Sequence, residues 1–445
     1  MLANKNWQDR FRKKIVSGED AARRITSGMS IQDIHMDEAF AVVHPLTKRM
    51  DLENVTVYVG IMPPDSPFAE PEKLKGRFNI FSLFLNRASS PLVDEGLVSY
   101  IPSHNSRCSR IFTDHHVKLD VIILNVTPPD RHGFLSMSYS PILYKPTVHE
   151  LKKEQGKDLL VIACINEDLP FCCGDTLIHE SEIDLMVEDH HPMKPHPWYS
   201  EDQLGGKLPG IAANVATLVD DAATLEFGIG RVPPHVCRAL GEKNDLGIHT
   251  EVMSGPIFDL VEKGVVTGRY KDFNPYQVIF SFALVDRMEM FDWFDRNPTC
   301  AAYPLSYVCD PELASKNHKF TAINSALQVD LTGQVNSEVR FNAQWSGTGG
   351  HADFSRAACM CEGGKSIVAI PSTSNDGTIS RITGGPLYPT GVTTARTDIQ
   401  YVVTEYGIAK IMGSSLKACA HALIEIAHPK FREQLKDQAK EQHLW

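Results

Sequence analysis

Long apolar runs mark the first half of the chain. Three of them, VTVYVGI at 55–61, VIILNV at 121–126 and LLVIACI at 159–165, contain almost no polar position. A strand with one face in water alternates apolar and polar residues, whereas a strand covered on both faces is apolar throughout. Helix-like stretches and Gly/Pro turns separate these runs. The pattern therefore predicts an α/β fold with a largely parallel sheet.

The second half of the chain shows the same alternation of apolar strands, helix-like stretches and turns. Residues 210–240 read as helix, strand, glycine turn and helix, and VIFSFALV at 278–285 and KSIVAIP at 365–371 are further buried strands. Between the halves, residues 186–210 are dense in His, Pro, Gly and charge, as linkers are. We predict two open α/β domains of similar size, an N-terminal one at 1–190 and a C-terminal one at 210–445, joined by a linker at 191–209.

Composition and charge narrow the class of protein. The 445 residues carry 44 Lys plus Arg against 55 Asp plus Glu, a net charge of −11 without a basic run, so nucleic acid is an unfavourable partner. The ten cysteines form no C-x-x-C pair, and no apolar run approaches the length of a membrane span. These features predict a cytoplasmic protein with reduced thiols and no membrane contact. His190, His191 and His196 fall in the Pro-rich linker, so we assign no metal site to them.

A glycine turn follows the predicted strand in LEFGIGRVPPHV, residues 225–236. Gly228 and Gly230 precede a helix that starts at a Pro-Pro pair, so backbone N–H groups and a helix N-terminus can face an anionic ligand. The third glycine of a dinucleotide fingerprint is absent, because position 233 is Pro, which disfavours a nicotinamide dehydrogenase. A purely structural turn is the alternative.

A second glycine stretch is SGTGGHADFSRAA, residues 346–358. Three glycines in four positions allow a backbone that lies against a ligand, either as an anion cradle or as an oxyanion hole. A tight turn without ligand contact is the alternative. We expect Asp353 and Arg356 to pair with each other and fix the loop.

The segment LGIHTEV, residues 246–252, ends a short predicted strand on a carboxylate. Glu251 has three open roles: surface solvation, general base or covalent nucleophile. Open α/β sheets place ligands at the carboxyl ends of their strands, which favours a ligand-facing residue. We expect the carboxyl group to be ionised unless it is deeply buried.

Taken together, these motifs resemble the acetyl-CoA hydrolase/transferase family, which includes 4-hydroxybutyrate and butyryl-CoA:acetate CoA-transferases. The matching stretches are TPPDRHG at 127–133, LEFGIGRVP, LGIHTE, VNSE at 336–339, SGTGGHADFSRAA, SRITGG at 380–385 and VTEYGIAKIMG at 403–413. They span nearly the whole chain in a fixed order.

The resemblance implies roles for particular residues. Glu251 corresponds to the family's covalent nucleophile, and Gly349 and Gly350 to the glycine loop beside the glutamyl thioester, in an active site between the domains. The family's CoA-binding turn corresponds to Gly228, Ile229, Gly230, Arg231 and Val232. The resemblance further implies CoA or an acyl-CoA as substrate, no tightly bound cofactor, and a homodimer.

The implied reaction is ping-pong transfer of CoA from an acyl-CoA to a short carboxylic acid such as 4-hydroxybutyrate, butyrate, acetate, succinate or itaconate. Acyl-CoA hydrolysis on the same fold and a non-catalytic CoA-binding protein are the alternatives. The chain departs from the family at Met36, Asp37 and Glu38, where a small turn is usual and where the acyl pocket is expected. It also departs after Glu251, where Ser254-Gly255-Pro256 should rigidify the following turn.

Overall fold

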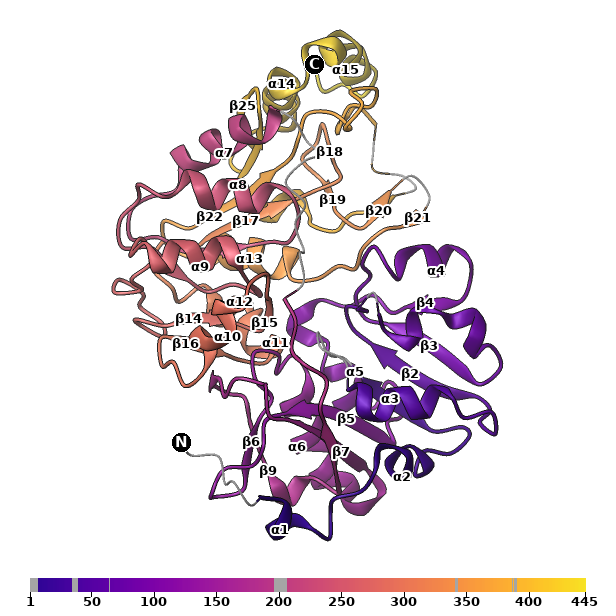
Figure 1. Cartoon of the computed structure of the whole chain (residues 1–445). Coiled ribbons are helices and arrows are strands. Elements are labelled where there is room, and N and C mark those ends of the chain that lie inside the picture. The colour runs from indigo at the N-terminus through magenta and orange to yellow at the C-terminus, as the bar shows by residue number, and fades with distance from the viewer. Residues whose placement is uncertain are drawn as a thin grey trace.

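The computed structural model describes residues 7–33, 39–63, 65–195, 206–340, 343–385, 387 and 390–445. Two open sheets dominate it, one in each half of the chain (Figure 1). The first has seven parallel strands in the order β10-β7-β5-β1-β2-β3-β4. Their bounds are β1 Ser30–Asp33, β2 Val55–Val59, β3 Phe78–Ser82, β4 Val98–Tyr100, β5 Val121–Val126, β7 Leu160–Asn166 and β10 Leu185–Asp189.

The second sheet has six strands in the order β12-β11-β17-β22-β24-β25, and only β24 and β25 pair antiparallel. Their bounds are β11 Thr224–Phe227, β12 Gly247–Ile248, β17 Thr321–Ser325, β22 Lys365–Ala369, β24 Tyr401–Thr404 and β25 Gly407–Lys410. The prediction of an α/β fold with largely parallel sheets is confirmed.

Helices cover the sheets. In the N-terminal half they are α1 Trp7–Phe11, α2 Gly18–Arg23, α3 Phe40–Thr47, α4 Ser90–Asp94, α5 Arg110–Thr113 and α6 Tyr144–Gln155. In the C-terminal half they are α7 Lys207–Leu218, α8 Val232–Ala239, α9 Gly255–Glu262, α10 Glu289–Phe294, α11 Leu305–Val308, α12 Pro311–Ala314, α13 His351–Met360, α14 Leu416–Ile426 and α15 Pro429–Glu441. Ser17 caps α2 by accepting from the Asp20 N–H, as residues of this type do at helix starts.

Five small sheets complete the fold. Their strands are β6 Phe134–Ser136 with β9 Leu177–His179, β13 Val252–Ser254 with β15 Phe282–Leu284, β14 Val278–Phe280 with β16 Cys300–Ala302 and β8 Cys173–Gly174, β18 Gln328–Asp330 with β19 Val335–Asn336 and β23 Ile382–Thr383, and β20 Val339–Arg340 with β21 Ala343–Gln344. Strand β8 comes from the first half of the chain and pairs with strands of the second. The two halves are therefore joined by hydrogen bonds as well as by side-chain packing.

Two local expectations were wrong. VIFSFALV does not form one strand: it breaks at Ser281 into β14 and β15, because the Ser281 and Phe282 N–H groups both donate to the Glu251 carbonyl, at 2.9 and 3.3 Å. Ser254-Gly255-Pro256 does not form a turn either. It starts helix α9 with Pro256 in the first turn, where a missing N–H costs nothing.

Candidate active site

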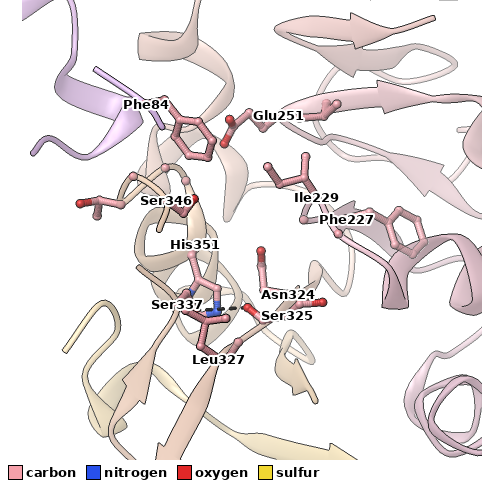
Figure 2. Close-up of a pocket in the computed structure, with 18 of the residues that line it drawn as sticks. Phe84, Phe227, Ile229, Glu251, Asn324, Ser325, Leu327, Ser337, Ser346 and His351 are labelled. Carbon is pink, nitrogen blue, oxygen red and sulfur yellow. Dashed lines mark hydrogen bonds between the residues drawn. The ribbon is translucent and has the colours of Figure 1, made fainter. Parts of the chain in front are cut away.

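The carboxyl ends of both large sheets meet at the boundary between the halves. Glu251 follows β12, Gly228 follows β11, and Asn324 lies near the end of β17. Phe84 follows β3 of the other sheet. All four line one cavity of about 290 Å³. In Figure 2, Glu251 and Phe84 lie beside each other at one end of this cavity, away from Asn324. Ligand sites of open α/β sheets occupy this position.

The residues before Glu251 hold its backbone in place. The Thr250 hydroxyl donates to the Phe227 carbonyl at 3.1 Å and accepts from the Phe227 N–H at 3.2 Å, which ties the end of β12 to the end of β11. Nε2 of His249 contacts the Val308 carbonyl at 2.8 Å. Burial lowers the pKa of His249 to about 3, so the ring is neutral and donates here. These two side chains position Glu251 and do not reach the cavity.

The Glu251 carboxyl group is only partly exposed, and burial raises its pKa to about 7. The nearby carboxyl group of Asp353 also raises the pKa, whereas hydrogen bonds from the Asn105 side chain and from the Gly350 N–H lower it. Burial therefore meets the condition under which we did not expect full ionisation, and the carboxyl group is about half ionised at neutral pH. Desolvation makes such a carboxylate a stronger nucleophile than one in water.

The glycine loop 347–350 lies directly against Glu251. Gly349 has φ +60, and a Cβ on Gly350 would stand 2.5 Å from Oε2 of Glu251. The loop is held from the other half of the chain: the Asn105 N–H donates to the Gly349 carbonyl at 3.2 Å, and the Tyr100 hydroxyl accepts from the Thr348 N–H at 2.9 Å. Gly350 therefore lies against the candidate nucleophile, whereas Gly349 lines the same cavity beside Phe84. Tyr100, at the end of β4, and Asn105 hold the loop.

Asp353 does not form the predicted pair with Arg356. Its carboxylate accepts from the N–H and hydroxyl of Ser106, at 3.0 and 2.8 Å, while Arg356 is exposed. Among the described residues no ion pair joins the two. A local i, i+3 pairing was the wrong expectation because Asp353 points into the boundary between the halves. It fixes the segment that carries Asn105.

The turn at 228–232 contributes to the same cavity in part. Gly228, Ile229 and Gly230 line it, whereas Val232 is buried in the core of the C-terminal half. Arg231 is exposed at the start of α8. Pro233 and Pro234, the second and third residues of α8, carry no N–H, so this helix start offers fewer free donors than the sequence pattern implied.

Sequence reasoning missed several residues of the site. Phe84 and Asn105 sit in ordinary loop sequence, and nothing local marks them. Glu226 and Asn324 carried a usable signal, since each places a polar group inside an apolar strand. Nδ2 of Asn324 donates to Oε2 of the buried Glu226 at 2.7 Å. Burial, with a further contribution from Glu251, raises the pKa of Glu226 well above its usual value, which favours its protonated form.

Glu226 is expected to act by holding Asn324 and not by carrying charge. Glu226→Gln should keep kcat within about threefold, because an amide oxygen can still accept from Asn324. Glu226→Leu should lower kcat by about tenfold or more, since it leaves the buried Asn324 amide without its acceptor. Steady-state kinetics on both variants checks this. A large loss in Glu226→Gln would show that the proton or charge of Glu226 itself matters.

The raised pKa of Glu251 has a kinetic consequence. A nucleophilic Glu251 would react as the carboxylate, so kcat/KM should rise with pH through an apparent pKa of about 7. Below this value the rate should fall by about tenfold per pH unit. Initial rates from about pH 5 to pH 8 at constant ionic strength measure this rise of kcat/KM with pH. A kcat/KM that does not change over this range would contradict the assignment of the pH dependence to Glu251. Glu226→Gln should show the same rise of kcat/KM with pH as the parent.

Two family models match the chain. The acetyl-CoA hydrolase/transferase N-terminal domain covers residues 1–195, and the C-terminal domain covers residues 287–439. The chain belongs to the acetyl-CoA hydrolase/transferase family. Within this family it is 36% identical to 4-hydroxybutyrate coenzyme A transferase of Clostridium kluyveri over 98% of this chain and 99% of the relative. It is 31% identical to butyryl-CoA:acetate CoA-transferase of Anaerostipes caccae over 99% of both chains.

Solved structures agree with this membership. RipA from Yersinia pestis superposes with a TM-score of 0.89 at 32% identity, covering 99% of this chain and all of that one. The chain is a CoA-transferase, as are the relatives that it matches over nearly their whole length. Met36, Asp37 and Glu38, where the chain departs from the family pattern, lie outside the described residues.

The described residues contain neither a membrane-spanning helix nor a cluster of metal ligands. No helix there is long and apolar enough to cross a membrane. No cluster of three or more His, Cys, Asp or Glu in the described part of the chain is arranged to hold a metal ion. The domain limits, the homodimer and the cytoplasmic location stay predictions of the sequence.

Proposed function

We propose that the enzyme transfers CoA from an acyl-CoA to a short carboxylic acid by a ping-pong route through Glu251. One observation carries the proposal: Glu251 lines a boundary cavity directly against the glycine loop, where a Cβ on Gly350 would stand 2.5 Å from Oε2 of Glu251. A nucleophile and an oxyanion donor must lie side by side for acyl transfer.

The reaction has two half-reactions. A carboxylate oxygen of Glu251 attacks the thioester carbonyl carbon, and the C–S bond breaks. The products are the CoA thiolate and a mixed anhydride between the acyl group and Glu251. The thiolate then attacks the Glu251 carbonyl carbon, the anhydride C–O bond breaks, and the first acid leaves as a carboxylate. The acceptor carboxylate reverses these steps, and Glu251 returns to its free form with no net proton change.

Each addition step creates an oxyanion. The Gly350 backbone N–H lowers the pKa of Glu251, so it is placed to stabilise an oxyanion on the Glu251 carbonyl. The Asn324 amide, held by Glu226, lines the same cavity and is a second candidate donor. Preorganised donors of this kind contribute a few kcal/mol each to the transition state.

The cavity of about 290 Å³ suits the pantetheine and nucleotide parts of CoA. Ile229 and Trp345 line it and remain 38% and 39% exposed, which is unusual for side chains of this size and fits contact with a bound ligand. Burial and, after it, the charges of Arg340 and Arg231 lower the pKa of Arg381. The Arg340 guanidinium lies 5.3 Å from the ring centroid of Trp345, which lines the cavity. Three guanidinium groups gathered in a protein of net charge −11 provide a local site for phosphate anions.

Intact-mass spectrometry tests the proposal. After incubation with an acyl-CoA and no acceptor, the enzyme should gain the mass of one CoA less one water, and peptide mapping should place the adduct on the peptide with Glu251. Addition of an acceptor acid should discharge it. Free CoA accumulating at the transfer rate without acceptor would instead favour hydrolysis, and CoA binding without turnover would favour a non-catalytic role.

A further inference from the structure

A second, smaller cavity lies on the other side of Glu251. Its volume is about 40 Å³, and it shares Glu251 and Phe84 with the larger cavity. The two cavities therefore meet at the proposed nucleophile. The thioester carbonyl joins the acyl chain to CoA, so a substrate positioned for attack has CoA in one cavity and the acyl chain in the other.

The walls of the small cavity are apolar. Side chains from both halves of the chain form them: Ile61, Leu83, Ile142, Leu143, Phe282 and Leu305. Only Ile61 in this set is more than slightly exposed. The apolar walls continue down to the carboxyl group of Glu251, which closes one end.

The other polar groups in the wall already have partners. The Asn105 side chain donates to Glu251, and the Cys108 thiol lies 3.3 Å from the His104 carbonyl and 3.6 Å from Oδ1 of Asn105. Among the described lining residues there is no Lys, Arg or His. Nothing in this part of the wall can pair with a second negative charge.

The backbone of the wall is held in an unusual conformation. Ile142 has φ +30, which a β-branched residue rarely adopts. Its carbonyl accepts from the Leu305 N–H at 2.8 Å, which links two walls of the cavity across the boundary. Strained backbone of this kind persists where the surroundings hold it, often at binding sites.

We propose that this cavity holds the hydrocarbon chain of the acyl group and selects short apolar monocarboxylates against dicarboxylates; this inference rests on the proposed function. A volume of 40 Å³ accommodates about three water-sized groups. That is enough for the chain of propionate, butyrate or valerate. The distal carboxylate of succinate would be buried without a partner, which is strongly unfavourable.

An acceptor panel tests this specificity. With acetyl-CoA as donor, the new acyl-CoA is measured by chromatography for propionate, butyrate, valerate, hexanoate and succinate. We expect kcat/KM to peak among the three shorter monocarboxylates and to be at least about 100-fold lower for succinate. Succinate used as well as butyrate would overturn the inference and leave the proposed function standing. If no acid accepted CoA, the proposed function would fail.

Cavity variants test the location. Leu143→Ala should move the best acceptor one or two carbons longer, because it removes a wall side chain. Leu151→Ala is the matched control: Leu151 is buried in helix α6 but does not line the cavity, so the preferred length should not move. If Leu143→Ala does not fold, Ile61→Ala examines the same wall at a more exposed position. An unchanged length preference in a folded wall variant would overturn the assignment.

Discussion

Glu251→Ala should abolish CoA transfer, with kcat lowered by about 10⁴-fold or more, because the variant has no carboxylate to form the anhydride and the glutamyl thioester. No other described carboxyl group can replace it. Glu226 is buried, has a raised pKa and accepts from the Asn324 amide, and Asp353 accepts from Ser106. Transfer between an acyl-CoA and a free acid, followed by chromatography, measures the loss. The variant should also fail to gain the CoA adduct.

Glu251→Gln separates this loss from misfolding. An ionised Glu251 is costly in the folded protein, since its pKa rises from 4.5 to about 7 on folding. This shift corresponds to roughly 3 kcal/mol of stability that is present below about pH 4.5 and is lost as pH rises through about 7. Glu251→Gln should therefore unfold at a higher temperature than the parent near pH 8, and the difference should shrink in acid. Near-parental CoA transfer by Glu251→Gln would refute the assignment of Glu251 as the nucleophile.

Gly350→Ala should lower kcat by about 10² to 10³-fold, the range seen when one oxyanion donor is lost. Its Cβ would lie 2.5 Å from Oε2 of Glu251 and 2.8 Å from Cε2 of Phe354. The loop must therefore move away from Glu251, and the Gly350 N–H moves with it. Because Gly350 does not have a positive φ, the effect comes from this contact and not from backbone strain. KM for the acceptor acid should change much less than kcat.

A matched glycine controls for this substitution. Gly385 has no heavy atom within 4 Å of a built Cβ and no positive φ, so Gly385→Ala should leave kcat unchanged. Near-normal CoA transfer by a folded Gly350→Ala variant would mean that the Gly350 N–H is not the donor to the oxyanion. Thermal unfolding of both variants distinguishes a displaced loop from a general loss of stability.

Much of the fold and part of the site followed from local sequence. Apolar runs predicted β2, β5 and β7, because burial on both faces shows directly in composition. The order helix, strand, turn and helix at 210–240 was correct for α7, β11 and α8. VIFSFALV was misjudged because its break depends on the Glu251 carbonyl, which is distant in the sequence and takes the N–H groups that would continue the strand.

By itself the sequence determined the α/β class and the family, and it predicted Glu251 and its two glycine loops as the site, since each depends on residues that are neighbours in the chain. Only the tertiary structure brought Phe84 and Asn105 against Glu251, more than a hundred residues away. It also decided the raised pKa of Glu251 and the apolar cavity beside it. Burial, pKa and cavity shape depend on which distant segments pack together, so no short stretch of sequence encodes them.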